Sequence, residues 1–350
     1  MYESFFGLTG KPFQLNPDPS FYFGSRGHKR AFAYLEYGLY QNEGFIIITG
    51  EIGAGKTTIV RSLLEQLDPD KVVAAQIVST QLDADDMLKA VGVAFGLPVR
   101  GVGKAMLLAS LEAFLCKITI EKKRALLVVD EAQNLSTRAV EELRMLSNFQ
   151  LGDQALLQSF LIGQPELREI MQSPQMQQLR QRVIASYHLG PLDKAETQGY
   201  IEHRLKHVGW NDSPRFEPAC FDLIHALTGG IPRRINTLCN RLLLAAFLAE
   251  RHVLDTSDVN AIAKEIREEL GPDAALSSVA IVGGNTSVER SLSTRMDPTM
   301  LHMHFDHIEE RIDRLEKTVA AAVDLLHRLL HPEKANKPGS PGNFAGSTTF

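Results

Sequence analysis

The chain has 350 residues, of which 44% are hydrophobic, enough to bury a large core in two or three domains. Its net charge of −5 at pH 7 excludes a protein that binds nucleic acid or anionic lipid through bulk charge. The three cysteines are widely spaced and form no C-x-x-C pair, so we predict free thiols in a reducing compartment.

No targeting or membrane-spanning segment is predicted. The first residues lack the basic and apolar stretches of a signal peptide, and the longest apolar run, 242–249, is much shorter than a membrane span. We therefore expect a cytoplasmic protein that attaches to the inner membrane only peripherally, through a partner.

The N-terminal quarter of the chain reads as a loop, a helix and then a strand and a helix. Residues 1–27 are rich in aromatic residues, Gly and Pro and predict an ordered loop, and residues 28–41 predict a helix. The apolar, β-branched run 45–49 predicts a buried strand. The apolar spacing of Ile59, Leu63 and Leu67 predicts a helix over 58–67.

Between that strand and helix, residues 50–57 match the phosphate-loop pattern G-x-x-x-x-G-K-[ST]. Glycines let the backbone turn tightly so that its N–H groups face phosphate oxygens, and the helix start adds further N–H donors. Lys56 would bind the β- and γ-phosphates, and the Thr57 hydroxyl would bind Mg²⁺. The predicted ligands are ATP and Mg²⁺, with the nucleotide held by Gly50, Ile52, Gly53, Ala54, Gly55, Lys56, Thr57 and Thr58.

Two carboxylates follow the next buried apolar run. A strand over 72–78 and helices over 83–95 and 104–120 lead to a strand that ends at Asp130 and Glu131. Because ligands of open α/β sheets bind at the carboxyl edge, we predict that Asp130 holds Mg²⁺ through water. Glu131 would orient and activate the attacking water. The alternative, an ordinary acidic strand end, is disfavoured by the phosphate loop upstream.

The rest of the first 190 residues continues the alternation of helices and strands. The predicted elements are a helix over 136–149, a strand over 156–162, helices over 165–171 and 175–183, and a strand over 186–189. Ser136 is the predicted N-cap of the first of these helices. This order predicts an α/β fold with a doubly wound parallel sheet. A separate helical domain follows, with helices over 194–208, 218–227, 232–250 and 257–270.

The C-terminal region differs in composition. Residues 271–297 predict a linker, and residues 332–350 a disordered tail. Between them, apolar residues at alternating spacings of three and four predict a coiled-coil helix over 298–331. We favour self-association of this helix over its folding back on the ATPase body. Histidines near 302–307 are interpreted as a solvated flank rather than a metal site.

These motifs together resemble the AAA-type ATPases of the general secretion pathway protein A class. Within that class the chain is most similar to the ATPase found with exosortase/PEP-CTERM and exopolysaccharide export systems. The resemblance covers residues 1–270 and rests, besides the phosphate loop, on Tyr2-x-x-Phe5-Phe6-Gly7-Leu8, Lys11-Pro12-Phe13, Pro17-Asp18-Pro19, Ser25-Arg26-Gly27-His28-Lys29-Arg30-Ala31, Asp130-Glu131-Ala132-Gln133-Asn134-Leu135, Leu161-Ile162-Gly163-Gln164-Pro165-Glu166-Leu167 and Gly229-Gly230-Ile231-Pro232-Arg233-Arg234-Ile235-Asn236.

The resemblance implies a domain layout and further site residues. Residues 1–190 would form the P-loop ATPase domain, with 1–41 as a nucleotide-contacting segment, and 191–270 the helical lid. Gln164 falls at the sensor-1 position, and Arg233 at sensor 2. Arg182 falls where a neighbouring subunit's arginine finger would be, with Arg180 as the second choice, and Arg234 is interpreted as a surface ion pair.

The implied function is an ATPase that powers or regulates assembly of an envelope secretion or exopolysaccharide export system. We expect a ring-like, nucleotide-dependent homo-oligomer with an envelope or membrane-associated partner, and we do not expect nucleic acid. Relatives in the class carry a membrane span and a peptidoglycan-binding domain, which we do not expect here. The alternatives are a nucleic-acid-associated ATPase of the transposition or replication-initiation kind and a nucleotide-gated scaffold, which would not need Glu131.

Overall fold

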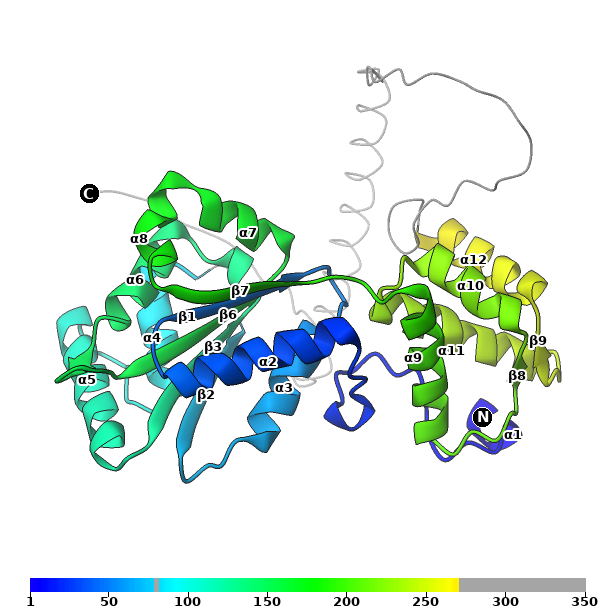
Figure 1. Ribbon diagram of the computed structural model, residues 1–350, viewed down its shortest axis with the longest axis horizontal. Coiled ribbons are helices and arrows are strands. Elements are labelled where there is room, and N and C mark those ends of the chain that lie inside the picture. The colour runs from blue at the N-terminus through cyan, green and yellow to red at the C-terminus, as the bar shows by residue number, and fades with distance from the viewer. Residues whose placement is uncertain (79–81, 271–350) are drawn as a thin grey trace, which may run out of the picture. The chain divides into compact units, whose positions relative to one another are not determined.

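A computed structural model describes residues 1–78 and 82–270 (Figure 1). The predicted linker 271–297, coiled-coil helix 298–331 and tail 332–350 lie outside the described residues. In the part of the chain that is described, no helix is both long enough and apolar enough to cross a membrane.

Five parallel strands form the central sheet, in the spatial order β2-β3-β6-β1-β7. β1 pairs with β6 from Phe45 opposite Ser159 to Thr49 opposite Gly163, and β3 pairs with the other edge of β6. The carboxyl ends of these three strands therefore meet at one edge of the sheet. The doubly wound parallel sheet is confirmed, with strands β1 (Phe45–Gly50), β2 (Val72–Val78), β3 (Arg124–Asp130), β6 (Leu157–Gly163) and β7 (Val183–Leu189).

The central strands β1, β3 and β6 are buried on both faces, which explains why they are largely apolar at successive positions, whereas the edge strands β2 and β7 are partly exposed. Because side chains alternate along a strand, Ile46 and Ile48 lie in one apolar cluster while Phe45 and Ile47 lie in the other. The first face packs against α2 (Arg26–Gln41) and α3 (Lys56–Gln66).

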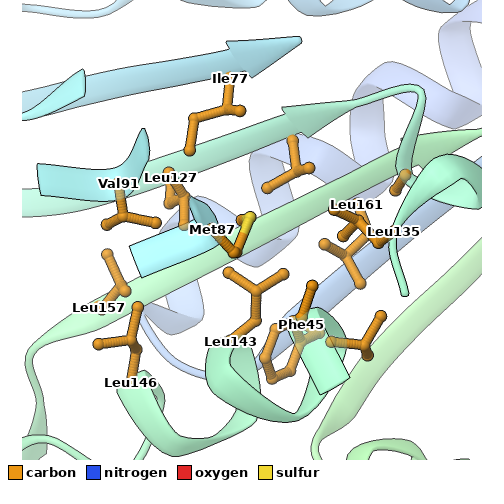
Figure 2. Close-up of a cluster of buried hydrophobic side chains, with 14 of the residues drawn as sticks. Phe45, Ile77, Met87, Val91, Leu127, Leu135, Leu143, Leu146, Leu157 and Leu161 are labelled. Carbon is orange, nitrogen blue, oxygen red and sulfur yellow. The ribbon is translucent and has the colours of Figure 1, made fainter. Parts of the chain in front are cut away.

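The second face carries the larger cluster (Figure 2). Met87 from α4 and Leu143 from α6 pack there among strand residues such as Leu127. The helices on this side of the fold are α4 (Ala84–Ala94), α5 (Lys104–Ile120), α6 (Thr137–Leu146), α7 (Pro165–Gln172) and α8 (Gln177–Arg180).

Two predicted helices are shorter in the structure. Ser136 is the N-cap of α6, as predicted, but α6 ends at Leu146 rather than Phe149. The chain then turns through a hairpin, β4 (Gln150–Leu151) and β5 (Gln154–Ala155), that was not predicted. The helix predicted over 175–183 is divided into a 3₁₀ turn (Pro174–Met176) and α8, because Val183 pairs with β1 in the sheet.

The helical domain contains the four predicted helices. They are α9 (Lys194–His207), α10 (Pro218–Thr228), α11 (Pro232–Leu248) and α12 (Thr256–Leu270). Asp193 and Glu196 form a capping box at the start of α9, which satisfies two backbone N–H groups that the helix itself leaves unpaired. The short parallel pair β8 (Arg215–Phe216) and β9 (Val253–Leu254) was not predicted.

The N-terminal segment is not only a loop. It contains the one-turn helix α1 (Tyr2–Phe5) and the 3₁₀ turn η1 (Pro19–Phe21). Its side chains Phe6 and Phe13 are buried in the same apolar cluster as the helices of the helical domain. A segment that the sequence assigned to the ATPase domain thus shares the core of the helical domain, and the domain boundaries stay predictions.

Candidate functional site

The phosphate loop joins the end of β1 to the start of α3. Gly53 and Gly55 have φ values of +82° and +101°, in the left-handed region that favours glycine. A Cβ atom on Gly53 would lie 2.3 Å from Cβ of Arg233, so the loop also needs glycine to let the helical domain approach.

Donors from three parts of the chain form hydrogen bonds to the carbonyl oxygens of the loop. Lys56 Nζ donates to Gly50 O at 2.7 Å and to Glu51 O at 3.0 Å. Arg233 N donates to Gly53 O at 3.1 Å, and His28 Nε2 lies 3.1 Å from Ala54 O. Engaging the carbonyl oxygens in this way favours a loop whose N–H groups are left for phosphate oxygens.

Lys56 is held ready for an anion. Its side chain is buried, and burial lowers its pKa, an effect partly offset by the charges of Glu131 and Asp130. The ammonium group is bonded to neutral carbonyl oxygens, which a phosphate oxygen would replace with a stronger, charge-assisted partner.

Thr57 and Asp130 are joined as the motifs predict. Thr57 Oγ1 donates to Asp130 Oδ2 at 2.9 Å, and Asp130 Oδ1 accepts the N–H of Glu131 at 3.0 Å. Burial raises the pKa of Asp130, and the Thr57 hydrogen bond partly offsets the rise. A hydroxyl and a carboxylate in contact are hard oxygen donors that suit Mg²⁺, so these two residues would hold the ion. When bound, Mg²⁺ would neutralise charge on the phosphate oxygens.

Glu131 is anchored through one of its two carboxylate oxygens. Gln133 Nε2 donates to Oε2 at 2.6 Å, and Gln164 Nε2 donates to the same oxygen at 3.0 Å. Partial burial acts to raise the pKa of Glu131, but these two hydrogen bonds and the charge of Lys56 outweigh it and lower the pKa overall. The side chain is therefore an ionised carboxylate at neutral pH, as a general base must be.

Lys56, Thr57 and Glu131 open onto one cleft, with about 980 Å³ of space between atoms, part of it solvent. Asp130 and Gln164 lie behind its lining and are joined to it through Thr57 and Glu131. The predicted site residues that line the cleft are Ile52, Gly53, Gly55, Lys56, Thr57, Thr58, Glu131 and Arg233. The N-terminal segment contributes Gln14–Asp18 and Phe21–Phe23, and the helical domain contributes Tyr200, Arg204, Pro232 and Asn236.

The two finger candidates do not line this cleft. Arg182 Nη1 donates to Ser147 O at 3.0 Å, and its Nη2 is hydrogen-bonded to the side chain of Asn148. Arg180 Nη1 donates to the carbonyl oxygens of Met171 at 2.6 Å and Ser173 at 2.7 Å. Neither arginine is brought to the site of its own chain, so a role for either remains a prediction about a neighbouring subunit.

Sequence reasoning did not single out three contributors. His28 contacts the phosphate loop, Gln133 contacts Glu131, and Arg204 lies between the helical domain and the N-terminal segment. The first two were inside motifs that carried the family resemblance, and that was the available signal. Arg204 lies outside those motifs, and its role appears only in three dimensions.

Comparison with known proteins defines the class. Residues 39–171 match the family model described as an AAA domain, and the fold and site agree with it, so the chain contains an AAA-type ATPase domain. A relative is the general secretion pathway protein A of Aeromonas hydrophila, 40% identical over 267 residues. The match covers 76% of this chain and 48% of the relative, so the chain spans about half of that protein's length.

Two solved structures share the fold. The Cdc6p protein of Pyrobaculum aerophilum is 18% identical, with 75% of this chain and 71% of that chain covered and a TM-score of 0.56. The Aeropyrum pernix ORC1 protein in complex with DNA is 18% identical, with 74% and 70% covered and a TM-score of 0.53. At this identity the likeness establishes the AAA fold alone.

Proposed function

We propose that this AAA-type ATPase hydrolyses ATP to power or regulate the assembly of an envelope export system. The observation that carries the hydrolytic part is the contact of Thr57, in the phosphate loop, with Asp130, beside an ionised, amide-anchored Glu131 that lines the same cleft as the loop. A protein that only bound nucleotide would need the loop but would not need a positioned carboxylate base.

Each residue then has a defined task. The loop N–H groups and Lys56 bind the phosphates, and Arg233, exposed at the cleft, adds a guanidinium near them. Glu131 accepts a proton from the attacking water, which makes that water a better nucleophile toward the γ-phosphorus. Gln164, expected at the sensor-1 position, acts at least through its hydrogen bond to Glu131.

The pathway assignment rests on the secretion-pathway relative, whose similarity extends over 76% of this chain. Because that relative is about twice as long as the matched region, its partners are carried over only as part of this proposal. Within it, we infer export of an exopolysaccharide in an exosortase-associated system, from the motifs over residues 1–270 that carry the family resemblance. Neighbouring exosortase and glycosyltransferase genes would support this assignment, and neighbouring transposition genes would contradict it.

The second candidate is a nucleic-acid-associated ATPase, because the fold is shared with an ORC1 protein solved in complex with DNA. Against it stands the net charge of −5. Fluorescence anisotropy with labelled duplex DNA, with and without ATP, separates the two. ATP-dependent binding that survives about 150 mM salt would favour the nucleic-acid function, since non-specific phosphate contacts weaken steeply with salt.

Two substitutions test hydrolysis. Lys56→Ala should abolish ATP binding, because the loop loses its only mobile cation. Glu131→Gln should bind ATP normally but hydrolyse it about a hundredfold more slowly, the scale of a lost general base. Binding is measured with a fluorescent ATP analogue and turnover by phosphate release. Glu36→Gln, an exposed carboxylate on α2, is the matched control. Full turnover in Glu131→Gln would remove Glu131 from the mechanism.

A further inference from the structure

Gln133 lies in a turn that the structure builds directly onto the end of β3. Glu131 adopts the left-handed conformation, with φ of 54°, and the 3₁₀ turn η2 (Ala132–Asn134) follows at once. A non-glycine residue in this conformation costs of order 1 kcal/mol or more, so the surrounding contacts must hold it there. The turn brings the Gln133 side chain back to the carboxylate two residues earlier.

The Gln133 amide bridges two strand ends. Its Nε2 donates to Glu131 Oε2 at 2.6 Å, and its Oε1 accepts the backbone N–H of Gln164 at 3.0 Å. Both partners fix the same orientation of the amide, because a carboxylate can only accept and a backbone N–H can only donate. The amide therefore has no equivalent flipped state at this position.

Gly163 makes room for this bridge. A Cβ atom on Gly163 would lie 2.9 Å from Gln133 Oε1, so a larger residue at the end of β6 would displace the amide. β3 and β6 are neighbours in the sheet, with Val129 opposite Leu161. The bridge thus ties the strand that carries the base to the strand that carries Gln164.

We propose that Gln133 is a positioning residue for ATP hydrolysis. Together with Gln164 it anchors Oε2 of Glu131, which leaves Oε1 to accept the proton of the attacking water. The inference rests on the proposed ATPase function and assigns to Gln133 a task that neither the motif nor the family model states. It acts through Glu131 and does not itself line the cleft.

Gln133→Ala should lower kcat about tenfold, less than the loss of the base itself, since Glu131 then keeps only the hydrogen bond from Gln164 and is less well positioned. KM and the affinity for a fluorescent ATP analogue should stay within about twofold, because the phosphate loop is untouched. Gln175→Ala, which removes an exposed glutamine amide outside the site, is the control and should keep wild-type turnover.

The split between kcat and ATP affinity distinguishes positioning from a general structural loss. Gln133→Glu keeps an acceptor for Gln164 N but places a second carboxylate against Glu131. Its kcat should fall at least as far as that of Gln133→Ala, while its ATP affinity should stay near that of the wild type.

Wild-type kcat in both variants, with a wild type that hydrolyses ATP, would overturn the inference alone. A wild type that binds but does not hydrolyse ATP would instead overturn the proposed function. A fall in ATP affinity as large as the fall in kcat would mean that the bridge is structural, which also contradicts the proposal.

Discussion

At the scale of single residues, His28 holds the phosphate loop in shape through a hydrogen bond to the backbone of Ala54. Its Nε2 must carry the hydrogen, because Ala54 O, 3.1 Å away, can only accept. Its Nδ1 then accepts from the Ser25 hydroxyl at 2.7 Å. Burial lowers the pKa of His28, which keeps it neutral at physiological pH and so keeps this arrangement. Gly55 approaches so closely that a Cβ there would lie 2.7 Å from Nε2.

His28→Leu should therefore weaken ATP binding about tenfold. It fills a similar space but leaves the buried carbonyl of Ala54 without its donor, at a cost of about 1–3 kcal/mol. His28→Gln places an amide donor at a similar reach and should recover most of the affinity. Titration of a fluorescent ATP analogue measures both variants. Equal affinity in His28→Leu and wild type would show that the loop holds its shape without this contact.

The site residues that sequence reasoning could propose are those whose chemistry is local. The phosphate loop, Thr57 and Asp130 follow from spacing and from strand-end position, and the structure brings them together, while their roles stay predictions. His28 and Gln133 were within quoted motifs, but their tasks depend on which atom faces which partner. That information comes from the turn after Glu131 and from the packing of α2 on the loop, and no spacing rule encodes it.

At the scale of elements, the N-terminal segment is fixed to the helical domain by Arg204 of α9. This side chain is buried, and its guanidinium donates to Pro12 O at 2.5 Å, to Gln14 O at 3.3 Å and to the Tyr200 hydroxyl at 2.8 Å. It also lies 4.7 Å from the centre of the Phe21 ring. Residues within 14–23 form one side of the nucleotide cleft, so the buried Arg204 helps to fix the position of that side.

Arg204→Met should free residues 14–23 from the helical domain. It should leave no large cavity, since the methionine side chain fills the space of the aliphatic part of the arginine. Two backbone carbonyls lose their donor, and we expect the free energy of unfolding to fall by about 2–4 kcal/mol. ATP affinity should fall as well, and limited proteolysis should cut within 10–22 faster than in wild type. Lys206→Met, an exposed cation on the same helix, should do none of this. Unchanged proteolysis would mean that the apolar contacts of Phe13 and Phe21 suffice.

The elements themselves were largely predictable, because an open parallel sheet buries both faces and leaves long apolar strands with helices between them. The failures have local causes. Residues 175–183 have helical composition, but Val183 is needed as a partner for β1 at the sheet edge. The pairs β4–β5 and β8–β9 are two residues long on each side, too short for alternation to be seen.

At the scale of the whole molecule, the cleft of one chain contains Arg233 but neither finger candidate. Arg182 is held near the end of α6 by Ser147 and Asn148, away from the cleft lining. A guanidinium that stabilises charge on the transferring phosphoryl group is worth several orders of magnitude in turnover. The proposed ring would supply that group from the next subunit, so that assembly and hydrolysis depend on each other.

Mixing two inactive variants tests this shared site. Arg182→Ala and Glu131→Gln subunits should each be nearly inactive alone. In a one-to-one mixture about a quarter of the interfaces should pair an intact Glu131 with an intact Arg182, since each is present in half of the subunits, and turnover should recover in proportion. Mixing Lys56→Ala with Glu131→Gln is the matched control, because both defects lie in the same half of the site and no interface is complete. Recovery in the control as well would point to residual activity rather than sharing. No recovery in either mixture would mean that the finger is not Arg182 or does not act in trans, and Arg180 would be the next residue to substitute.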